Sequence, residues 1–307
     1  FKSCQMNGVL LINKPAGSGS AEVVRRIKRF VKPAKVGHLG TLDPFATGVL
    51  PILIGEGTKL APFLQEGTRE YAGLIRLGSE TDTLDSTGQT IRTAPLPVLD
   101  PAQLSSVASR FTGTIAQTPP IFSAIKRRGV PLYRLARQGL PVEPPAPRKV
   151  DIKQLELEVT GADAIRFKVI CSPGMYVRSL ARDIGIMLTT AAHLSELRRV
   201  RSGAFSADDA VRLDQAVTAF ENGDTANLIT MRAALGSLPE VIIDDMLERR
   251  LRHGDSRALD RLCPEGASLF KVISDGELVA IARATSRTSA NIVRGFAYRE
   301  KDPIHFA

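Results

Sequence analysis

One segment constrains this chain more than any other: positions 36–48 read Val-Gly-His-Leu-Gly-Thr-Leu-Asp-Pro-Phe-Ala-Thr-Gly. Its glycines permit backbone geometries that a Cβ forbids, so the loop can bring its main chain close to a ligand. Pro44 fixes its own φ and biases Asp43 away from helical geometry, which favours one direction for the carboxylate. The pattern indicates a functional loop built around Asp43, although an Asp-Pro surface turn has the same local chemistry.

The chain is basic. Its 307 residues are 43% hydrophobic and 24% charged, which is ordinary for a globular protein large enough for two domains. The formal net charge of +9 favours a polyanionic partner, although a basic surface without a specific partner gives the same number. Lysines and arginines crowd positions 25–35, directly before the loop, and recur at 126–128, 198–201 and 249–252. If these groups converge on one face, phosphate contacts would make binding strongly salt-dependent.

Cysteine usage and hydropathy indicate the compartment. The three cysteines, Cys4, Cys171 and Cys263, are far apart and form no Cys-x-x-Cys pair. This argues against a disulfide framework or a zinc site and for a reducing, cytoplasmic environment. No apolar run is long enough to cross a membrane, and no signal-peptide pattern is present, so we expect no membrane association.

A short acidic cluster is the remaining candidate for a cation site. Glu80, Asp82 and Asp85 lack the spacing of a calcium-binding loop, and nothing nearby completes a coordination sphere. We therefore interpret the cluster as a solvated turn and expect no metal.

Strand and helix patterns alternate along the chain, which predicts an α+β fold. Pro51 lies inside the apolar run 49–54 and favours an edge or irregular position for that strand. The four prolines of 141–147 indicate a rigid connector. The remaining patterns predict strands over 9–12 and 71–77, helices over 21–31, 101–111 and 179–188, and a hairpin joining 149–159 to 165–171.

The character of the sequence changes after Leu238-Pro239. Short β-like runs follow at 240–243, 268–273 and 278–284, separated by turns such as Ser-Asp-Gly-Glu at 274–277. We therefore predict two domains, 1–238 and 239–307.

The loop 36–48 also carries a resemblance. Gly37-His38-x-Gly40-Thr41-Leu42-Asp43-Pro44-x-Ala46-x-Gly48 resembles the signature loop of the TruB family of bacterial tRNA pseudouridine-55 synthases. These enzymes convert the T-loop uridine of tRNA to pseudouridine, and their catalytic aspartate matches Asp43. Further segments resemble the family in the same order: 8–17 with its Lys-Pro turn, Arg69-Glu70-Tyr71, 119–139, Tyr176-x-Arg178-Ser179-Leu180 and 193–199. Departures from the family pattern occur at Asn13, at Ser18-Gly19-Ser20 and at Leu39.

The resemblance implies an architecture and a partner. It implies the pseudouridine synthase fold, with a mixed, mostly antiparallel sheet, flanking helices and an RNA-binding insertion at about 100–150. It implies a small C-terminal β-barrel of the PUA type over 239–307, which binds RNA. The substrate would be tRNA, held by its T-arm and acceptor stem, with no cofactor and no obligate protein partner.

The chemistry assigns roles to the matching residues. Making pseudouridine breaks the N1–C1′ bond, turns the uracil and rejoins it through C5. An ionised carboxylate such as Asp43 can act as a nucleophile, but attack at C1′, attack at C6 and removal of the C2′ proton all remain open. The guanidinium of Arg178, matched to the family's arginine, would keep Asp43 charged; otherwise Arg178 is an ordinary structural arginine.

Two tyrosines and three further residues complete the predicted site. Tyr71 and Tyr176 could stack on a flipped-out base, and Tyr71 could relay the C5 proton; a core tyrosine is the alternative for each. The resemblance further implies that His38 supports the flipped nucleotide or the loop, that Lys14 anchors the loop or a phosphate, and that Leu197 lines the pocket. Core packing explains Leu197 equally well.

Other functions remain as alternatives. A non-catalytic tRNA-binding or RNA-folding protein would have no need of a carboxylate facing RNA. A guide-dependent synthase acting on ribosomal RNA is a further alternative. The segment 119–139 of this chain resembles the bacterial, stand-alone branch instead. A retaining glycosidase would need a second carboxylate about 5 Å from the first, and none is evident.

Overall fold

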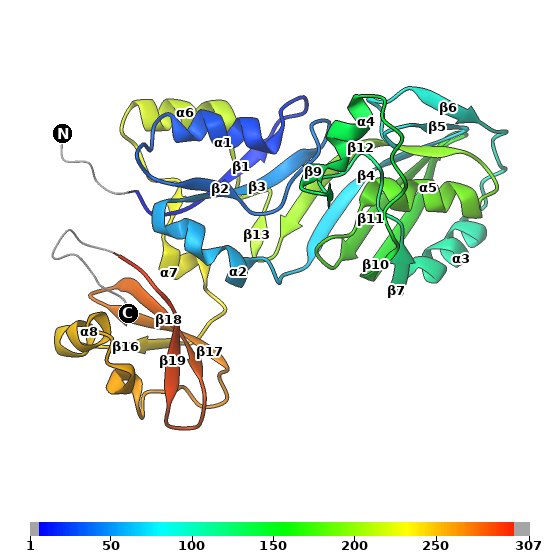
Figure 1. The fold of residues 1–307 in the computed structure, drawn as a ribbon. Helices are drawn as coiled ribbons and strands as arrows, with labels where there is room; N and C mark the ends of the chain where they lie inside the picture. The colour runs from blue at the N-terminus through cyan, green and yellow to red at the C-terminus, as the bar shows by residue number, and fades with distance from the viewer. Residues whose placement is uncertain (1–5, 298–307) are drawn as a thin grey trace.

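The computed structural model describes residues 6–297, and a mixed sheet forms its centre (Figure 1). The 11-stranded sheet has the order β14-β1-β3-β12-β4-β11-β10-β7, with β2, β13 and β15 paired beside it. Its strands are β1 (Gly8–Lys14), β2 (Val36–His38), β3 (Thr47–Ile54), β4 (Arg69–Leu77), β7 (Gly113–Gln117), β10 (Arg148–Gly161), β11 (Ala164–Cys171), β12 (Ala192–Ser202), β13 (Phe205–Ser206), β14 (Val211–Arg212) and β15 (Leu228–Ile229). Only the β1–β14 and β12–β3 pairings are parallel within this described sheet. The predicted fold class is confirmed.

Four longer helices cover one face of this sheet, and two short helices pack against the other face. The α-helices are α1 (Ser20–Lys28), α2 (Ala61–Leu64), α3 (Pro101–Phe111), α4 (Leu132–Arg137), α5 (Val177–Met187), α6 (Leu213–Glu221), α7 (Met231–Ala234) and α8 (Asp245–Arg252), with 3₁₀ turns at Gly55–Leu60 and Ser256–Leu259. Apolar residues of the longer helices α1, α3, α5 and α6 share one buried cluster with the sheet, whereas the short helices α2 and α7 pack against the other face beside β1. Figure 1 shows α1 and α6 side by side at one end of the sheet and α3 and α5 at the other. The helices predicted over 101–111 and 179–188 are confirmed as α3 and α5, whereas α1 ends before the predicted residue 31.

The opposite face of the central strands is open. Successive side chains of a strand point to opposite faces, so Ile75 and Leu77 of β4 enter the core while Leu74 and Arg76 do not. These outward residues line a groove together with residues of β11, β12 and the loop 36–48. The main lining residues are Phe45, Thr47, Leu74, Arg76, Arg166, Lys168, Leu197 and Arg198.

Pro51 was predicted to take an edge or irregular position, and only the edge alternative was wrong. Its strand, β3, lies between β1 and β12 inside the sheet rather than at an edge. The register explains how a residue without an N–H is tolerated there. On the far side from β1, β12 pairs only with Thr47 and Gly48, and β2 pairs with residues 52–54. Pro51 thus lies where one neighbouring strand gives way to the next.

The chain after residue 238 forms a second sheet. It has the order β16-β17-β18-β19, and it is not closed into a barrel within residues 6–297. Its strands are β16 (Glu240–Ile242), β17 (Leu269–Ser274), β18 (Glu277–Ala284) and β19 (Ala290–Gly295). Ile273, Leu278 and Phe296 pack in one apolar cluster with Val9 and Leu11 of β1. The second sheet is therefore joined to the first by buried apolar contact.

Two short hairpins and one long one complete the fold. β5 (Ser79–Thr81) pairs with β6 (Thr90–Thr93), and β8 (Lys126–Arg127) pairs with β9 (Val130–Pro131). The predicted hairpin joining 149–159 to 165–171 is confirmed as β10 and β11. None of the helices described between residues 6 and 297 has the length and hydropathy needed to span a bilayer.

Candidate active site

An ion pair joins two of the predicted site residues. Arg178, on the first turn of α5, donates from Nε to Oδ2 of Asp43 at 2.8 Å and from Nη2 to Oδ1 at 2.9 Å. The arginine side chain is 5% exposed and the aspartate 31%, so the arginine is buried while part of the carboxylate faces solvent. Two parallel bonds of this kind fix both the charge and the direction of a carboxylate. The loop and α5 thus meet as the sequence predicted.

Arg178 is itself held from three sides. Its Nη1 donates to the backbone oxygen of Thr83 at 2.8 Å, and its Nη2 donates to that of Phe122 at 3.0 Å. Oδ2 of Asp85 lies 3.7 Å from Nε, and the Asp85 side chain is 6% exposed. The other oxygen of Asp85 accepts from Thr83 and twice from Thr87. The interpretation of Asp85 as part of a solvated turn was therefore wrong, because its carboxylate is buried beside Arg178.

Tyr176 precedes α5 and is fixed by residues of β7 and β10. The amide of Gln117, which is fully buried, accepts from the backbone N–H of Tyr176 at 2.8 Å and donates to its carbonyl at 3.1 Å. The guanidinium of Arg148 lies over the tyrosine ring, 4.7 Å from its centre. Ser179 donates to the backbone oxygen of Thr118. The chain that leaves β7 and returns at β10 is thereby attached to the start of α5.

Lys14 anchors the loop through hydrogen bonds to backbone oxygens. Its side chain is fully buried, and Nζ donates to the backbone oxygens of Pro15, Ser18 and Pro44 at 2.8, 2.7 and 3.1 Å. Of the two roles proposed for it, this geometry matches loop anchoring. Burial lowers the pKa of Lys14 to about 8, while the nearby Asp43 carboxylate opposes that shift.

Two departures from the family pattern have structural partners. The hydroxyl of Ser20 accepts from the N–H of Leu42 at 2.9 Å and donates to the carbonyl of Leu42 at 3.0 Å. These two hydrogen bonds fix the backbone of the residue directly before Asp43. Leu39 is fully buried in an apolar cluster, where a small polar side chain would leave a gap.

Arg199 connects Tyr71 to the loop 36–48. The sequence interpretation had counted this arginine only among the basic groups at 198–201. Tyr71 lies beside Arg199 in the pairing of β4 with β12, and their side chains are hydrogen-bonded. Arg199 also donates to the backbone oxygens of Gly40 and Val49. The sequence could have revealed Arg199 only as a charged residue at an inward-facing position of a strand. The bulges of β12 interrupt the alternation of inward and outward side chains, so this position could not be recognised.

His38 and Leu197 complete the predicted set. Burial, followed by the charge of Arg199, lowers the pKa of His38, so its imidazole is neutral near pH 7. Leu197 packs in the core and also lines the groove, which satisfies both interpretations. Within residues 6–297, no group of histidine, cysteine, aspartate and glutamate is arranged to hold a metal ion.

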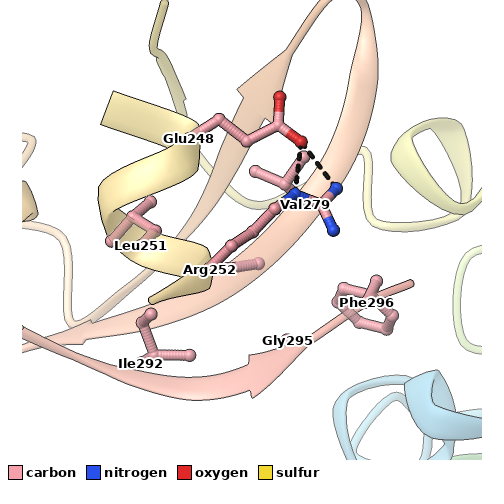
Figure 2. Close-up of a pocket in the computed structure, with 8 residues that line it drawn as sticks. Glu248, Leu251, Arg252, Val279, Ile292, Gly295 and Phe296 are labelled. Atoms are coloured by element: carbon pink, nitrogen blue, oxygen red, sulfur yellow. Dashed lines mark hydrogen bonds and ion pairs between the residues drawn. The ribbon is translucent and has the colours of Figure 1, made fainter. Parts of the chain in front are cut away.

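A small hollow in the second sheet lies apart from this site. Figure 2 shows Leu251, Val279 and Ile292 forming its apolar wall beneath α8, with the Glu248–Arg252 ion pair beside them. In Figure 1, α8 and α5 lie at opposite ends of the molecule. The carboxylate of Glu248 at this hollow is paired with Arg252 of the same helix.

Comparisons with known proteins identify the family of the chain. Residues 28–177 match the N-terminal domain model of the TruB family pseudouridylate synthases, and residues 178–242 match the C-terminal domain model of tRNA pseudouridylate synthase B. The chain is 41% identical over 285 residues to tRNA pseudouridine synthase B of Geobacter sulfurreducens, covering 90% of this chain and 93% of that relative. It is 41% identical over 276 residues to the protein of the same name from Aromatoleum aromaticum, covering 90% and 88%.

Solved structures give the same result for the fold. A chain of a Cbf5–Nop10–Gar1 complex is 26% identical with a TM-score of 0.68, covering 96% of this chain and 86% of that one. A chain of an H/ACA RNP bound to a substrate RNA containing 2′-deoxyuridine is 25% identical with a TM-score of 0.68, covering 98% and 88%. The chain therefore belongs to the TruB family of pseudouridylate synthases, a class of isomerases.

The lowered pKa of Lys14 predicts how stability depends on pH. The folded state binds this proton less tightly than the unfolded state, so folding is favoured as pH rises from about 8 toward 10.5. Between pH 7 and 9 the free energy of unfolding of the wild type should rise by about 1.3 kcal/mol relative to Lys14→Met. Urea unfolding of both proteins at each pH measures this difference, because other titrating groups cancel. Parallel pH profiles would contradict the assignment.

Proposed function

We propose that this chain isomerises the T-loop uridine of tRNA, U55, to pseudouridine. The observation that carries the proposal is the two-bond ion pair between the buried Arg178 and the partly exposed Asp43. The pair holds the Asp43 carboxylate in one direction beside a permanent positive charge, and every mechanism considered for the aspartate uses an ionised carboxylate. The names of the relatives, tRNA pseudouridine synthase B, support tRNA as the substrate class.

Each residue of the site has a place in the reaction. Asp43 reacts with the nucleotide after the uridine has left its stack, at C1′, at C6 or at the C2′ proton. Tyr71 stacks on the base and relays the proton that leaves C5. Tyr176 adds a second aromatic surface, and Leu197 forms an apolar wall for the detached uracil. Stacking offsets the few kcal/mol that unstacking a nucleotide costs.

His38 and Lys14 act on the loop. A neutral His38 supports the flipped nucleotide without adding a charge near Asp43. Lys14 draws the backbone of Pro15, Ser18 and Pro44 together, which holds Asp43 against Arg178. No step of this isomerisation calls for a redox cofactor.

The open groove supplies the RNA-binding surface. Arg76, Arg166, Lys168 and Arg198 line it, and it reaches the loop just after Asp43. We assign the T-arm to this groove and to the insertion at about 100–150. We assign the acceptor stem to residues 239–307 as a PUA-like domain, which the separate sheet beginning at β16 supports. The free thiols of Cys171 and Cys263 support a cytoplasmic location.

A guide-dependent synthase is the second candidate. The likeness to chains of Cbf5 and H/ACA complexes favours it. The higher identity to the relatives named tRNA pseudouridine synthase B favours the first candidate. Activity of the isolated chain on bare tRNA separates the two.

The Asp43→Asn variant tests the proposed nucleophile. It keeps the size of the side chain but loses the charge, so turnover should fall by roughly 1,000-fold or more while tRNA affinity changes little. The measurement is tritium release from C5-labelled tRNA transcript, together with the position of the product in the RNA. Appreciable residual turnover, or release away from the T-loop, would remove Asp43 or U55 from the account.

Salt dependence tests the groove. Lys168→Ala should weaken tRNA binding and reduce the slope of log K against log salt concentration by about 0.7 to 0.9, the value for one lost phosphate contact. The matched control is Lys153→Ala, an exposed lysine of β10 that does not line the groove. Equal effects of both substitutions would argue against the groove as the RNA path.

A further inference from the structure

Arg199 is a cation enclosed at the centre of the main sheet. It lies on β12, where the register places it beside Gly48 of β3 on one side and Tyr71 of β4 on the other. The residue is 1% exposed. A Cβ at Gly48, whose φ is +102°, would overlap the backbone of Arg199, so glycine lets β12 approach the end of the loop. The loop 36–48 and Arg199 are therefore packed as one unit.

The hydrogen bonds of Arg199 connect Tyr71 to that loop. Nε donates to the backbone oxygen of Val49 at 2.9 Å and Nη2 to that of Gly40 at 3.2 Å. The guanidinium is also hydrogen-bonded to the phenol of Tyr71. One side chain thus joins the backbone on both sides of Asp43 to the hydroxyl of the tyrosine.

Arg199 has no carboxylate partner in the part of the chain that the structure describes. None of the ion pairs found there includes it. A buried charge without a counter-charge is costly, and it is seldom retained without a reason. The acidic group in contact with Arg199 is the phenol of Tyr71.

The groups around Tyr71 pull its ionisation in opposite directions. Burial raises the pKa of Tyr71, and Cys171 of β11 adds to that shift. Arg199 of β12 and Arg69 of β4 oppose it, because a positive charge favours the phenolate. The phenol is neutral at rest, and Arg199 makes its transient ionisation less costly.

We propose that Arg199 is a positioning residue that acts through Tyr71: it holds the phenol against the signature loop and stabilises the phenolate formed as Tyr71 carries the C5 proton. This inference rests on the proposed function. Once the uracil is rejoined through C5, Tyr71 gives its hydroxyl proton to N1 and becomes a phenolate. The phenolate takes the proton from C5, and the C5–H electron pair forms the C5=C6 bond while the N1=C6 pair returns to N1. The phenol is restored, and one proton has passed from C5 to N1.

The ionisation of Tyr71 can be measured without any substrate. The chain has four tyrosines and no tryptophan, so tyrosinate absorbance is readable, and Tyr71→Phe identifies the contribution of Tyr71. In Arg199→Gln, which removes the charge, the Tyr71 midpoint should move upward. In Arg199→Lys, which keeps it, the midpoint should stay closer to wild type. The matched control Arg201→Gln, an exposed arginine of the same strand, should leave the midpoint unchanged.

Single-turnover kinetics provide the second readout. Tritium release from C5 should slow by about 10- to 100-fold in Arg199→Gln, the effect of losing one charge-assisted hydrogen bond, while tRNA affinity is retained. Arg199→Lys should lose less. In a Tyr71→Phe background, Arg199→Gln should cause little further loss, because both substitutions remove the same interaction.

Three results would overturn the inference. An unchanged Tyr71 midpoint and rate in folded Arg199→Gln would do so, as would additive losses with Tyr71→Phe. If Arg199→Gln does not fold, Arg199→Lys decides: a large loss of rate with a wild-type Tyr71 midpoint would contradict the inference. Failure of the proposed function would give a different result, because the wild type itself would then release no tritium. The Tyr71 titration would still show whether Arg199 affects the ionisation of the phenol.

Discussion

The site depends on one buried guanidinium. Arg178 bonds to both carboxylate oxygens of Asp43, to the backbone oxygens of Thr83 and Phe122, and lies beside Asp85. These partners come from separate parts of the chain, so the contacts of Arg178 bring together the signature loop, the turn after β5, the middle of the segment 100–150 and α5. A guanidinium suits this task because its donors form a rigid planar fork and its charge is permanent.

A second buried arginine supports the same loop from the sheet. Arg178 acts on the side chain of Asp43, whereas Arg199 bonds to the backbone of Gly40 and Val49. Lys14 adds three backbone bonds below the loop. Three cations thus surround a loop whose one carboxylate must stay ionised, and each is held by carbonyl oxygens. This arrangement explains the glycine at position 48, since close approach of the Arg199 backbone leaves no room for a Cβ there.

Sequence patterns predicted much of this arrangement, and the misses have physical causes. The Asp43–Arg178 pair followed from the resemblance to the family, whereas the hairpin of β10 and β11 and the helix α5 followed from local periodicity. Asp85 was misread because a carboxylate in a polar turn looks solvated until a partner distant in sequence covers it. Pro51 takes the irregular position rather than the edge, because the change of neighbour from β12 to β2 is set by tertiary pairing. Arg199 was missed because strand bulges hide its inward direction.

The central claim is that the forked geometry of Arg178, and not its charge alone, prepares Asp43 for reaction. Arg178→Lys tests it most directly, because lysine keeps the charge but cannot make both bonds to Asp43 while reaching Thr83 and Phe122. The measurement is the single-turnover rate of C5 tritium release at saturating tRNA, with the tRNA dissociation constant determined on the same protein. We expect a loss of about 100-fold in rate with binding retained. A rate equal to the wild type would contradict it.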